Sequence, residues 1–247
     1  MLSVVIPTLN EAENLRTLIP ELYRSLEGRK FEVVIMDGRS ADCTRQLVQE
    51  YSRKYPRLRL ITQSGKGFAN ALTEGMLKAD GEVIVTMDAE NHRPSEIPLL
   101  LEKLGEGFDV VVGSRFMKGS KVDLPPERFI STRIANKIAQ AAFELRIKDT
   151  SSGFRAYNAA LIKKAISGGI KTEYFSCQVE LLEKAKAVGG KLAEVPAHYV
   201  RRDKGESKYD IKPALKDASK LMDIVKEKKL EELDRIIPKA RKAKERA

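Results

Sequence analysis

The chain has 247 residues, 42% of them hydrophobic and 32% charged, with a net charge of +10. This length suits one α/β domain with an appendage, or at most two small domains. The basic surplus attracts phosphate groups, but the chain has no zinc-ligand spacing, no aromatic RNA-binding signature and no Trp, so nucleic acid is not expected as a partner. With Cys43 and Cys177 as the only cysteines, no disulfide framework is expected, and a reducing cytoplasm fits.

The first half of the chain alternates β-branched runs with amphipathic stretches. Buried strands are predicted at residues 3–6, 31–36, 58–62, 82–87 and 109–113. Helices are predicted between them at residues 14–26, 43–55, 66–78 and 95–104. Strands separated by single helices indicate an α/β fold with a Rossmann-type, mostly parallel sheet flanked by helices. Ligands bind beyond the carboxyl ends of such strands, and polar clusters follow all five.

The second half changes character. It is predicted to contain a polar loop, a helix, a loop, a helix and a strand, at residues 118–126, 128–146, 149–155, 174–188 and 192–199. From residue 211 to 247 the sequence is helical in pattern and carries 12 Lys or Arg against 7 Asp or Glu. We therefore predict a domain of residues 1–209 and a basic helical extension of residues 210–247.

The clearest chemical feature follows the fourth predicted strand, where residues 87–92 read Met-Asp-Ala-Glu-Asn-His. Asp88 and Glu90 are separated by one residue and so leave the strand end on the same side, and His92 follows at the same spacing. The three side chains can bind Mg²⁺ or Mn²⁺, which would neutralise charge on a diphosphate leaving group. The alternatives are an acidic turn that caps the helix starting near Ser95 and, for His92, a solvated loop position.

Three other clusters follow predicted strands. Residues 7–11, Pro-Thr-Leu-Asn-Glu, open a helix whose start can receive a phosphate or a nucleoside edge, or hold ordinary helix-start residues. Asp37 can bond a ribose or base, whereas Asp42 and Thr44 are expected to cap the next helix. Lys66, between Gly65 and Gly67, supplies a charge for phosphate.

Basic residues gather later in the chain, in Gly-Ser-Arg at residues 113–115, at Arg128 and Arg133, and in Ser-Ser-Gly-Phe-Arg at residues 151–155. The guanidinium fork suits phosphate oxygens, although any one arginine can also be a solvated surface residue. Residues 201–208, Arg-Arg-Asp-Lys-Gly-Glu-Ser-Lys, form a glycine-containing basic loop that can close over a bound diphosphate.

Taken in order, these motifs resemble family 2 glycosyltransferases of the GT-A fold, and within them the dolichol-phosphate mannose and glucose synthases. The match covers about residues 1–209 and consists of Pro-Thr-x-Asn-Glu at 7–11, Asp-x-x-Ser-x-Asp-x-Thr at 37–44, Gly-Lys-Gly-x-Ala at 65–69, Asp-Ala-Glu at 88–90, Gly-Ser-Arg at 113–115, Ser-Gly-Phe-Arg at 152–155 and Arg-x-x-Gly-x-Ser-Lys at 202–208. Leu9 stands where Tyr is usual, Gly38 and Glu90 where Asp is usual, and His92 where Gln is usual.

The resemblance implies a role for each matched residue. It places a nucleotide-sugar site at Pro7, Leu9, Glu11, Ile35, Asp37, Lys66, Met87, Asp88, Ala89, Glu90, Arg115, Arg202 and Lys208. It places the acceptor phosphate at Arg115, Arg128, Thr132 and Arg202. Asp88, Glu90 and His92 would hold the metal, and Asp88, Glu90 and Arg202 would be the catalytic residues.

The implied reaction transfers mannose or glucose from GDP-mannose or UDP-glucose to dolichyl or polyprenyl phosphate, in one inverting displacement that depends on Mg²⁺ or Mn²⁺. A phosphate acceptor is already ionised near pH 7, since its second pKa is about 6, and needs no strong general base. Three alternatives stay open: a sugar-hydroxyl acceptor, a nucleotidyltransferase, and a nucleotide-sugar binding module without turnover.

The apolar tail of such an acceptor requires an apolar surface on the protein. Phe129, Ile130, Ile134, Ile138 and Phe143 recur at helical spacing near the predicted phosphate site, although core packing is the commoner reason for such a stripe. The basic extension can attract anionic lipid at about 1 kcal/mol per Lys or Arg, pack on the domain or mediate self-association. Because no signal peptide and no apolar run of ~20 residues is evident, we expect peripheral contact at the cytoplasmic face of a membrane.

Overall fold

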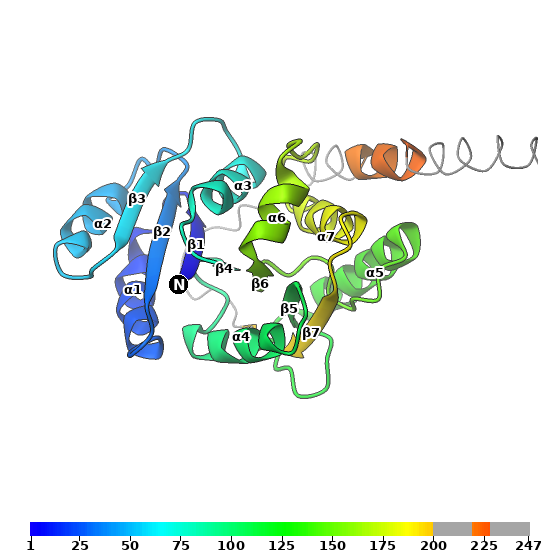
Figure 1. Cartoon of the computed structure of the whole chain (residues 1–247), viewed down its shortest axis with the longest axis horizontal. Helices are drawn as coiled ribbons and strands as arrows, with labels where there is room; N and C mark the ends of the chain where they lie inside the picture. The colour runs from blue at the N-terminus through cyan, green and yellow to red at the C-terminus, as the bar shows by residue number, and fades with distance from the viewer. Residues whose placement is uncertain (200–218, 228–247) are drawn as a thin grey trace, which may run out of the picture.

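The computed structural model describes residues 1–199 and 219–227. Its centre is a seven-stranded sheet of order β3-β2-β1-β4-β6-β5-β7 (Figure 1). The strands are β1 Leu2–Thr8, β2 Phe31–Asp37, β3 Leu58–Thr62, β4 Val83–Thr86, β5 Val110–Ser114, β6 Arg155–Asn158 and β7 Leu192–Pro196. β6 runs antiparallel to both of its neighbours, and all the other pairs are parallel.

Helices cover both faces of the sheet (Figure 1). They are α1 Ala12–Ser25, α2 Thr44–Ser52, α3 Phe68–Lys78, α4 Ile97–Gly105, α5 Pro126–Phe143, α6 Ala159–Ile166 and α7 Cys177–Ala187, with a 3₁₀ turn, η1, at Pro94–Glu96. Because successive strand residues point to opposite faces, Val4 and Ile6 of β1 pack with α1, α2 and α4, whereas Val5 packs with α3, α6 and α7. Two apolar cores therefore sandwich the sheet.

The predicted mostly parallel sheet flanked by helices is confirmed, with strand ends shifted by one or two residues for β1 to β5. The sequence did not predict β6 or α6, because residues 149–155 were interpreted as a loop and residues 156–173 were assigned to no element. Instead Arg155 begins β6 and pairs with Thr86 of β4 and Val112 of β5. Since β6 runs in the opposite direction, the loop before it lies at the edge where β4 and β5 end, beside the loops that the sequence placed there.

The described part of the basic extension packs on the domain. Residues 219–227 are helical, Val225 is buried in the core beside α6 and α7, and Leu221 and Ile224 pack against it. Lys220 pairs with Glu173 at its start. The predicted boundary near residue 209 and the rest of the extension lie outside the described residues. Within residues 1–199 and 219–227, none of the helices combines the length and apolar character that a bilayer span requires.

Candidate active site

The loops after β1 and β2 are locked together by side-chain to backbone hydrogen bonds. Asn10, in a left-handed conformation with φ 54°, accepts a hydrogen bond from the backbone of Ala41 at 2.8 Å and donates its own N–H to Ser40 Oγ at 2.9 Å. The Glu11 N–H donates to Thr44 Oγ1 at 2.9 Å. The polar clusters at residues 7–11 and 37–44 therefore form one rigid unit at the sheet edge.

Asp42 ties the starts of two helices, as the sequence favoured. Its carboxylate accepts the backbone N–H of Thr44 at 2.9 Å and that of Ala12 at 3.2 Å, the first residues of α2 and α1. Burial would raise the pKa of Asp42, but these hydrogen bonds outweigh it and lower the pKa. The role of Asp42 is to hold the loops.

Asp37 ends β2 wholly buried and accepts the backbone N–H groups of Arg39 at 3.0 Å and Ser40 at 3.2 Å. Beside it, a Cβ at Gly38 would lie 3.2 Å from Thr8 O and from Gln63 Nε2. The glycine thus permits a close approach between the ends of three neighbouring strands.

The remaining residues predicted to line the nucleotide pocket divide by burial. Ile35, Met87 and Ala89 are buried beneath the edge, whereas Leu9 and Lys66 are exposed. Arg39 donates to the carbonyl oxygens of Gly65 at 2.9 Å and Ser64 at 3.1 Å, which brings the loop that carries Lys66 to the same edge.

The acidic loop after β4 alternates as its sequence predicted. Met87 and Ala89 are buried, while Asp88 and Glu90 are partly exposed. The loop before β6 lies directly against it, because Thr86 Oγ1 donates to Gly153 O at 2.8 Å. A Cβ at Gly153 would lie 3.2 Å from Asp88 Oδ1, so this close approach favours a glycine.

His92 is buried, and a solvated loop position is therefore wrong. Its ring stacks on Phe154, with 5.1 Å between centroids, and meets Tyr199 edge-on at 5.7 Å. Burial and the charge of Arg115, against the opposing charge of Asp149, together lower the pKa of His92 to about 3. The imidazole is thus neutral near pH 7, the form that binds metal ions.

Both ring nitrogens of His92 are buried without a hydrogen-bond partner among the described residues. Nδ1 lies 3.9 Å from Asp88 Oδ2. Two carboxylates and a neutral imidazole fit Mn²⁺ or Mg²⁺ by donor chemistry. Over residues 1–199 and 219–227, however, no three such side chains are gathered as one cation site, so Asp88, Glu90 and His92 are neighbours rather than an assembled set.

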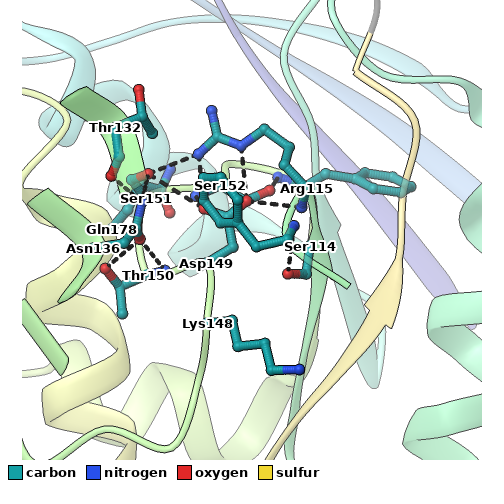
Figure 2. A network of polar contacts seen from close by, with 12 residues as sticks. Ser114, Arg115, Thr132, Asn136, Lys148, Asp149, Thr150, Ser151, Ser152 and Gln178 are labelled. Atoms are coloured by element: carbon teal, nitrogen blue, oxygen red, sulfur yellow. Dashed lines mark hydrogen bonds and ion pairs between the residues drawn. The ribbon is translucent and has the colours of Figure 1, made fainter. Parts of the chain in front are cut away.

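Arg115, after β5, is held by a buried ion pair (Figure 2). Its Nε and Nη2 donate to the two carboxylate oxygens of Asp149, each at 2.7 Å, and Nη2 also donates to Ser151 Oγ at 2.7 Å. Burial alone would raise the pKa of Asp149, but Arg115 outweighs it and lowers that pKa. The third guanidinium nitrogen, Nη1, makes no contact with the other residues drawn in Figure 2.

Asn136 joins this ion pair to α5. It is buried, donates to Ser151 Oγ at 3.1 Å and to Thr132 O at 2.8 Å, and accepts from Thr150 Oγ1 at 2.7 Å (Figure 2). Thr132 and the exposed Arg128, both predicted to meet an acceptor phosphate, are thereby placed on the same rigid support as Arg115.

Arg155, of the Ser-Gly-Phe-Arg motif, has a structural role in the described residues. It is wholly buried and donates to the carbonyl oxygens of Thr150 and Gln178, each at 2.7 Å. Asp149 and Asn136 were not predicted as site residues. Only their burial in a polar cluster indicates that these two residues belong to the site, and burial cannot be read from a single sequence.

A cavity of about 370 Å³ lies beside Arg115, lined by Arg115, Phe116, Met117, Ser120, Val122, Phe129 and Arg133. Next to it, Ile130, Ile134 and Ile138 are each more than half exposed on α5. The interpretation that the stripe packs in the core is therefore wrong for these three isoleucines. It is confirmed for Phe143, which is buried. The other two predicted residues, Arg202 and Lys208, lie outside the described residues.

Known proteins are similar to this chain over most of its length. Residues 3–166 match the family described as glycosyl transferase family 2. The chain is 37% identical over 212 residues to a dolichol-phosphate mannosyltransferase of Pyrococcus furiosus, covering 83% of this chain and 58% of the relative. It is 29% identical to a polyprenol monophosphomannose synthase of Mycolicibacterium smegmatis, covering 83% and 79%. The chain thus spans somewhat more than half of the Pyrococcus protein.

Solved structures support the fold. Glucosyl-3-phosphoglycerate synthase from Mycobacterium tuberculosis, crystallised with Mn²⁺, uridine diphosphate and glucosyl-3-phosphoglycerate, matches with a TM-score of 0.64 at 19% identity, over 83% of this chain and 73% of that one. The same enzyme with Mg²⁺ and uridine diphosphate matches with a TM-score of 0.63 at 19% identity, over 83% and 72%. These are GT-A glycosyltransferases, so the expected GT-A fold is confirmed. The chain belongs to glycosyl transferase family 2.

Proposed function

We propose that the protein transfers a hexose from a nucleotide sugar to a polyprenyl or dolichyl phosphate. The observation that carries this proposal is that the acidic loop and Arg115 share one support, the loop before β6. Gly153 of that loop closely approaches Asp88, and Asp149 and Ser151 of the same loop bind Arg115. Carboxylates suit a metal-bound donor diphosphate, and a guanidinium suits a second phosphate. The names of the two sequence relatives favour a lipid phosphate as acceptor and mannose as the sugar.

The donor half of the site uses the loops after β1 to β4. Pro7, Leu9, Glu11, Ile35 and Asp37 would surround the nucleoside, with Met87 and Ala89 below it and Lys66 near the phosphates. Asp88 and Glu90, with His92 beside them, would hold a divalent cation, which when bound neutralises charge on the departing diphosphate. Arg202 and Lys208 complete the proposed phosphate contacts. GDP-mannose is the donor that we expect ahead of UDP-glucose.

The acceptor half uses Arg115, Arg128 and Thr132, with Arg202. Guanidinium groups hold two oxygens of the acceptor phosphate, and the third oxygen faces the anomeric carbon of the sugar. Its lone pair forms the new carbon–oxygen bond while the bond to the nucleoside diphosphate breaks on the opposite side, which inverts the anomeric centre. The acceptor phosphate already carries its second charge near pH 7, so no side chain has to remove a proton.

One assay tests the function. The protein is incubated with Mn²⁺, labelled GDP-mannose or UDP-glucose, and polyprenyl phosphate in detergent, and the lipid is extracted. We expect label in the lipid, its loss with EDTA and its return when Mn²⁺ is added in excess. Transfer only to sugar hydroxyls, or tight donor binding without turnover, would contradict the proposal. In a parallel incubation with a nucleoside triphosphate and a sugar 1-phosphate, release of pyrophosphate would instead indicate a nucleotidyltransferase.

The exposed isoleucines of α5 give a second prediction, on peripheral membrane contact. Replacing Ile130, Ile134 and Ile138 together by Gln removes about 1 kcal/mol of apolar transfer energy for each half-exposed side chain. We expect vesicle binding, measured by co-sedimentation with polyprenyl-phosphate liposomes, to fall by about 100-fold. Donor binding should not change.

A matched control places Gln at Leu77 and Leu99, two leucines that are nearly half exposed on α3 and α4. This variant should sediment with vesicles as the wild type does. If the wild type and the isoleucine variant sedimented equally, the exposed isoleucines of α5 would not contribute to membrane binding.

A further inference from the structure

Tyr199 follows β7 and is fixed through its backbone. Its N–H donates to Lys121 O at 2.8 Å and its carbonyl oxygen accepts the N–H of Asp123 at 2.9 Å. The preceding residue, His198, donates its N–H to Glu96 Oε2 at 3.0 Å, and its ring Nδ1 also contacts that carboxylate. Glu96 belongs to η1, directly after the acidic loop. Tyr199 is therefore anchored by its own backbone to the loop after β5, and through His198 to η1, which follows the acidic loop.

The Tyr199 ring lies between the two halves of the proposed site. Its face is 5.4 Å from the Arg115 guanidinium carbon, and it meets His92 at 5.7 Å with an interplanar angle of 83°. Both residues that the ring contacts are themselves held in place, because His92 stacks on Phe154 and Arg115 is paired with Asp149. The ring is thus a wedge with fixed supports on both sides.

A ring held in this way can keep the two halves of the site apart. The Arg115 guanidinium is paired with Asp149, but the Asp88 carboxylate also acts on it, so in the absence of phosphates a residual attraction draws the two halves together. Direct contact would leave no space for a diphosphate and an acceptor phosphate between them. A planar aromatic ring resists compression, and its negative face attracts the guanidinium that Asp149 also pairs.

We propose that Tyr199 is a positioning residue whose aromatic ring sets the separation between the acidic loop and Arg115, so that donor and acceptor phosphates bind at the distance the transfer requires. This inference rests on the proposed function. It assigns the task to the ring and not to the hydroxyl, because the ring makes the contacts to His92 and Arg115.

The experiment compares Tyr199→Phe, Tyr199→Leu and Tyr199→Ala in the full chain. Phe keeps the ring, and Leu keeps apolar volume should Ala unfold. We expect Phe to retain the wild-type kcat, and Leu and Ala to lose about 100-fold in kcat, the loss that a misplacement of about 1 Å causes. The KM for the donor should change little. Tyr55→Ala, at a half-buried tyrosine of a distant aromatic cluster, should lower thermal stability without lowering kcat.

A second readout does not depend on activity. The chain has two histidines, so its imidazole NMR spectrum is simple, and the ring currents of Tyr199 and Phe154 act on the His92 resonance. We expect that resonance to stay in Tyr199→Phe and to move in Tyr199→Leu and Tyr199→Ala. Loss of kcat in Phe equal to that in Leu would overturn the proposal in favour of the hydroxyl. An unmoved resonance and an unchanged kcat in Leu would overturn it outright.

The two proposals fail in different ways. A wild-type protein that transfers no sugar to any phosphate acceptor would overturn the proposed function and, with it, the catalytic purpose of the wedge. A wild type that transfers sugar, beside Leu and Ala variants that transfer it equally well, would overturn only the role of Tyr199.

Discussion

Replacing Asp88 by Asn is expected to lower the rate of sugar transfer by about 10²- to 10³-fold, the loss typical when one group that stabilises transition-state charge is removed. The substitution keeps the shape of the side chain and removes its charge. Because Asp88 is the proposed cation ligand and its side chain is 26% exposed, the loss should appear as a lower kcat and a higher Mn²⁺ concentration for half-maximal activity. Both are measured with labelled donor and polyprenyl phosphate.

Stability separates this effect from damage to the fold. A partly exposed Asp→Asn change should alter the free energy of unfolding in urea by less than about 1 kcal/mol. Asp80→Asn serves as the control, since Asp80 is exposed and pairs with Arg59 away from the acidic loop, and transfer should not change. If the Asp88→Asn protein were active and its Mn²⁺ requirement were unchanged, Asp88 would not be a ligand of the cation.

Glu90 offers a graded version of the same test. It stands where the resembling family usually has Asp, so Glu90→Asp keeps the charge and shortens its reach, while Glu90→Gln keeps the reach and removes the charge. We expect transfer to survive the first change and to fall steeply with the second. The opposite order would show that the position of the side chain matters more than its charge.

The sequence predicted the sheet because β1 to β5 are short runs rich in apolar and β-branched residues that recur between amphipathic helices. It could not predict β6, whose four residues, Arg-Ala-Tyr-Asn, include two polar ones. Arg155 is acceptable in a central strand only because its guanidinium reaches Thr150 O and Gln178 O. Those partners come from a loop and from α7, so the strand depends on tertiary contacts that local pattern does not encode.

The same distinction separates the parts of the site. The partial exposure of Asp88 and Glu90 follows from the period of two along a strand, and the sequence was sufficient for it. The burial of His92 depends on Phe154 and Tyr199, and the anchoring of Arg115 depends on Asp149, 34 residues away. Motif spacing can indicate that an arginine is present at a strand end, but not that its charge is already paired.

That pairing gives the largest expected effect on stability. Asp149→Asn leaves the Arg115 guanidinium, whose side chain is 11% exposed, without an ionic partner. Breaking one side of a buried pair costs about 3–5 kcal/mol, and urea unfolding at pH 7 should show a loss of this size. The pKa of Asp149 is lowered in the folded protein. Its contribution is therefore full above the unfolded value of about 3.9 and is lost as the pH falls through the folded one, so wild type and variant should converge in acid.

A double variant shows what the pair is for. Replacing both partners, as Asp149→Asn with Arg115→Met, removes the stranded charge and should recover much of the stability lost in Asp149→Asn alone, since an apolar replacement of a buried pair is often neutral or stabilising. Sugar transfer should not recover, because the guanidinium proposed to hold the acceptor phosphate is gone. If transfer recovered together with stability, the pair would serve folding alone and the acceptor phosphate would be bound elsewhere. If neither recovered, the carboxylate of Asp149 would have a role beyond neutralising Arg115, most directly through the backbone N–H groups of Arg115 and Ser152 that it also accepts at 2.9 and 3.1 Å.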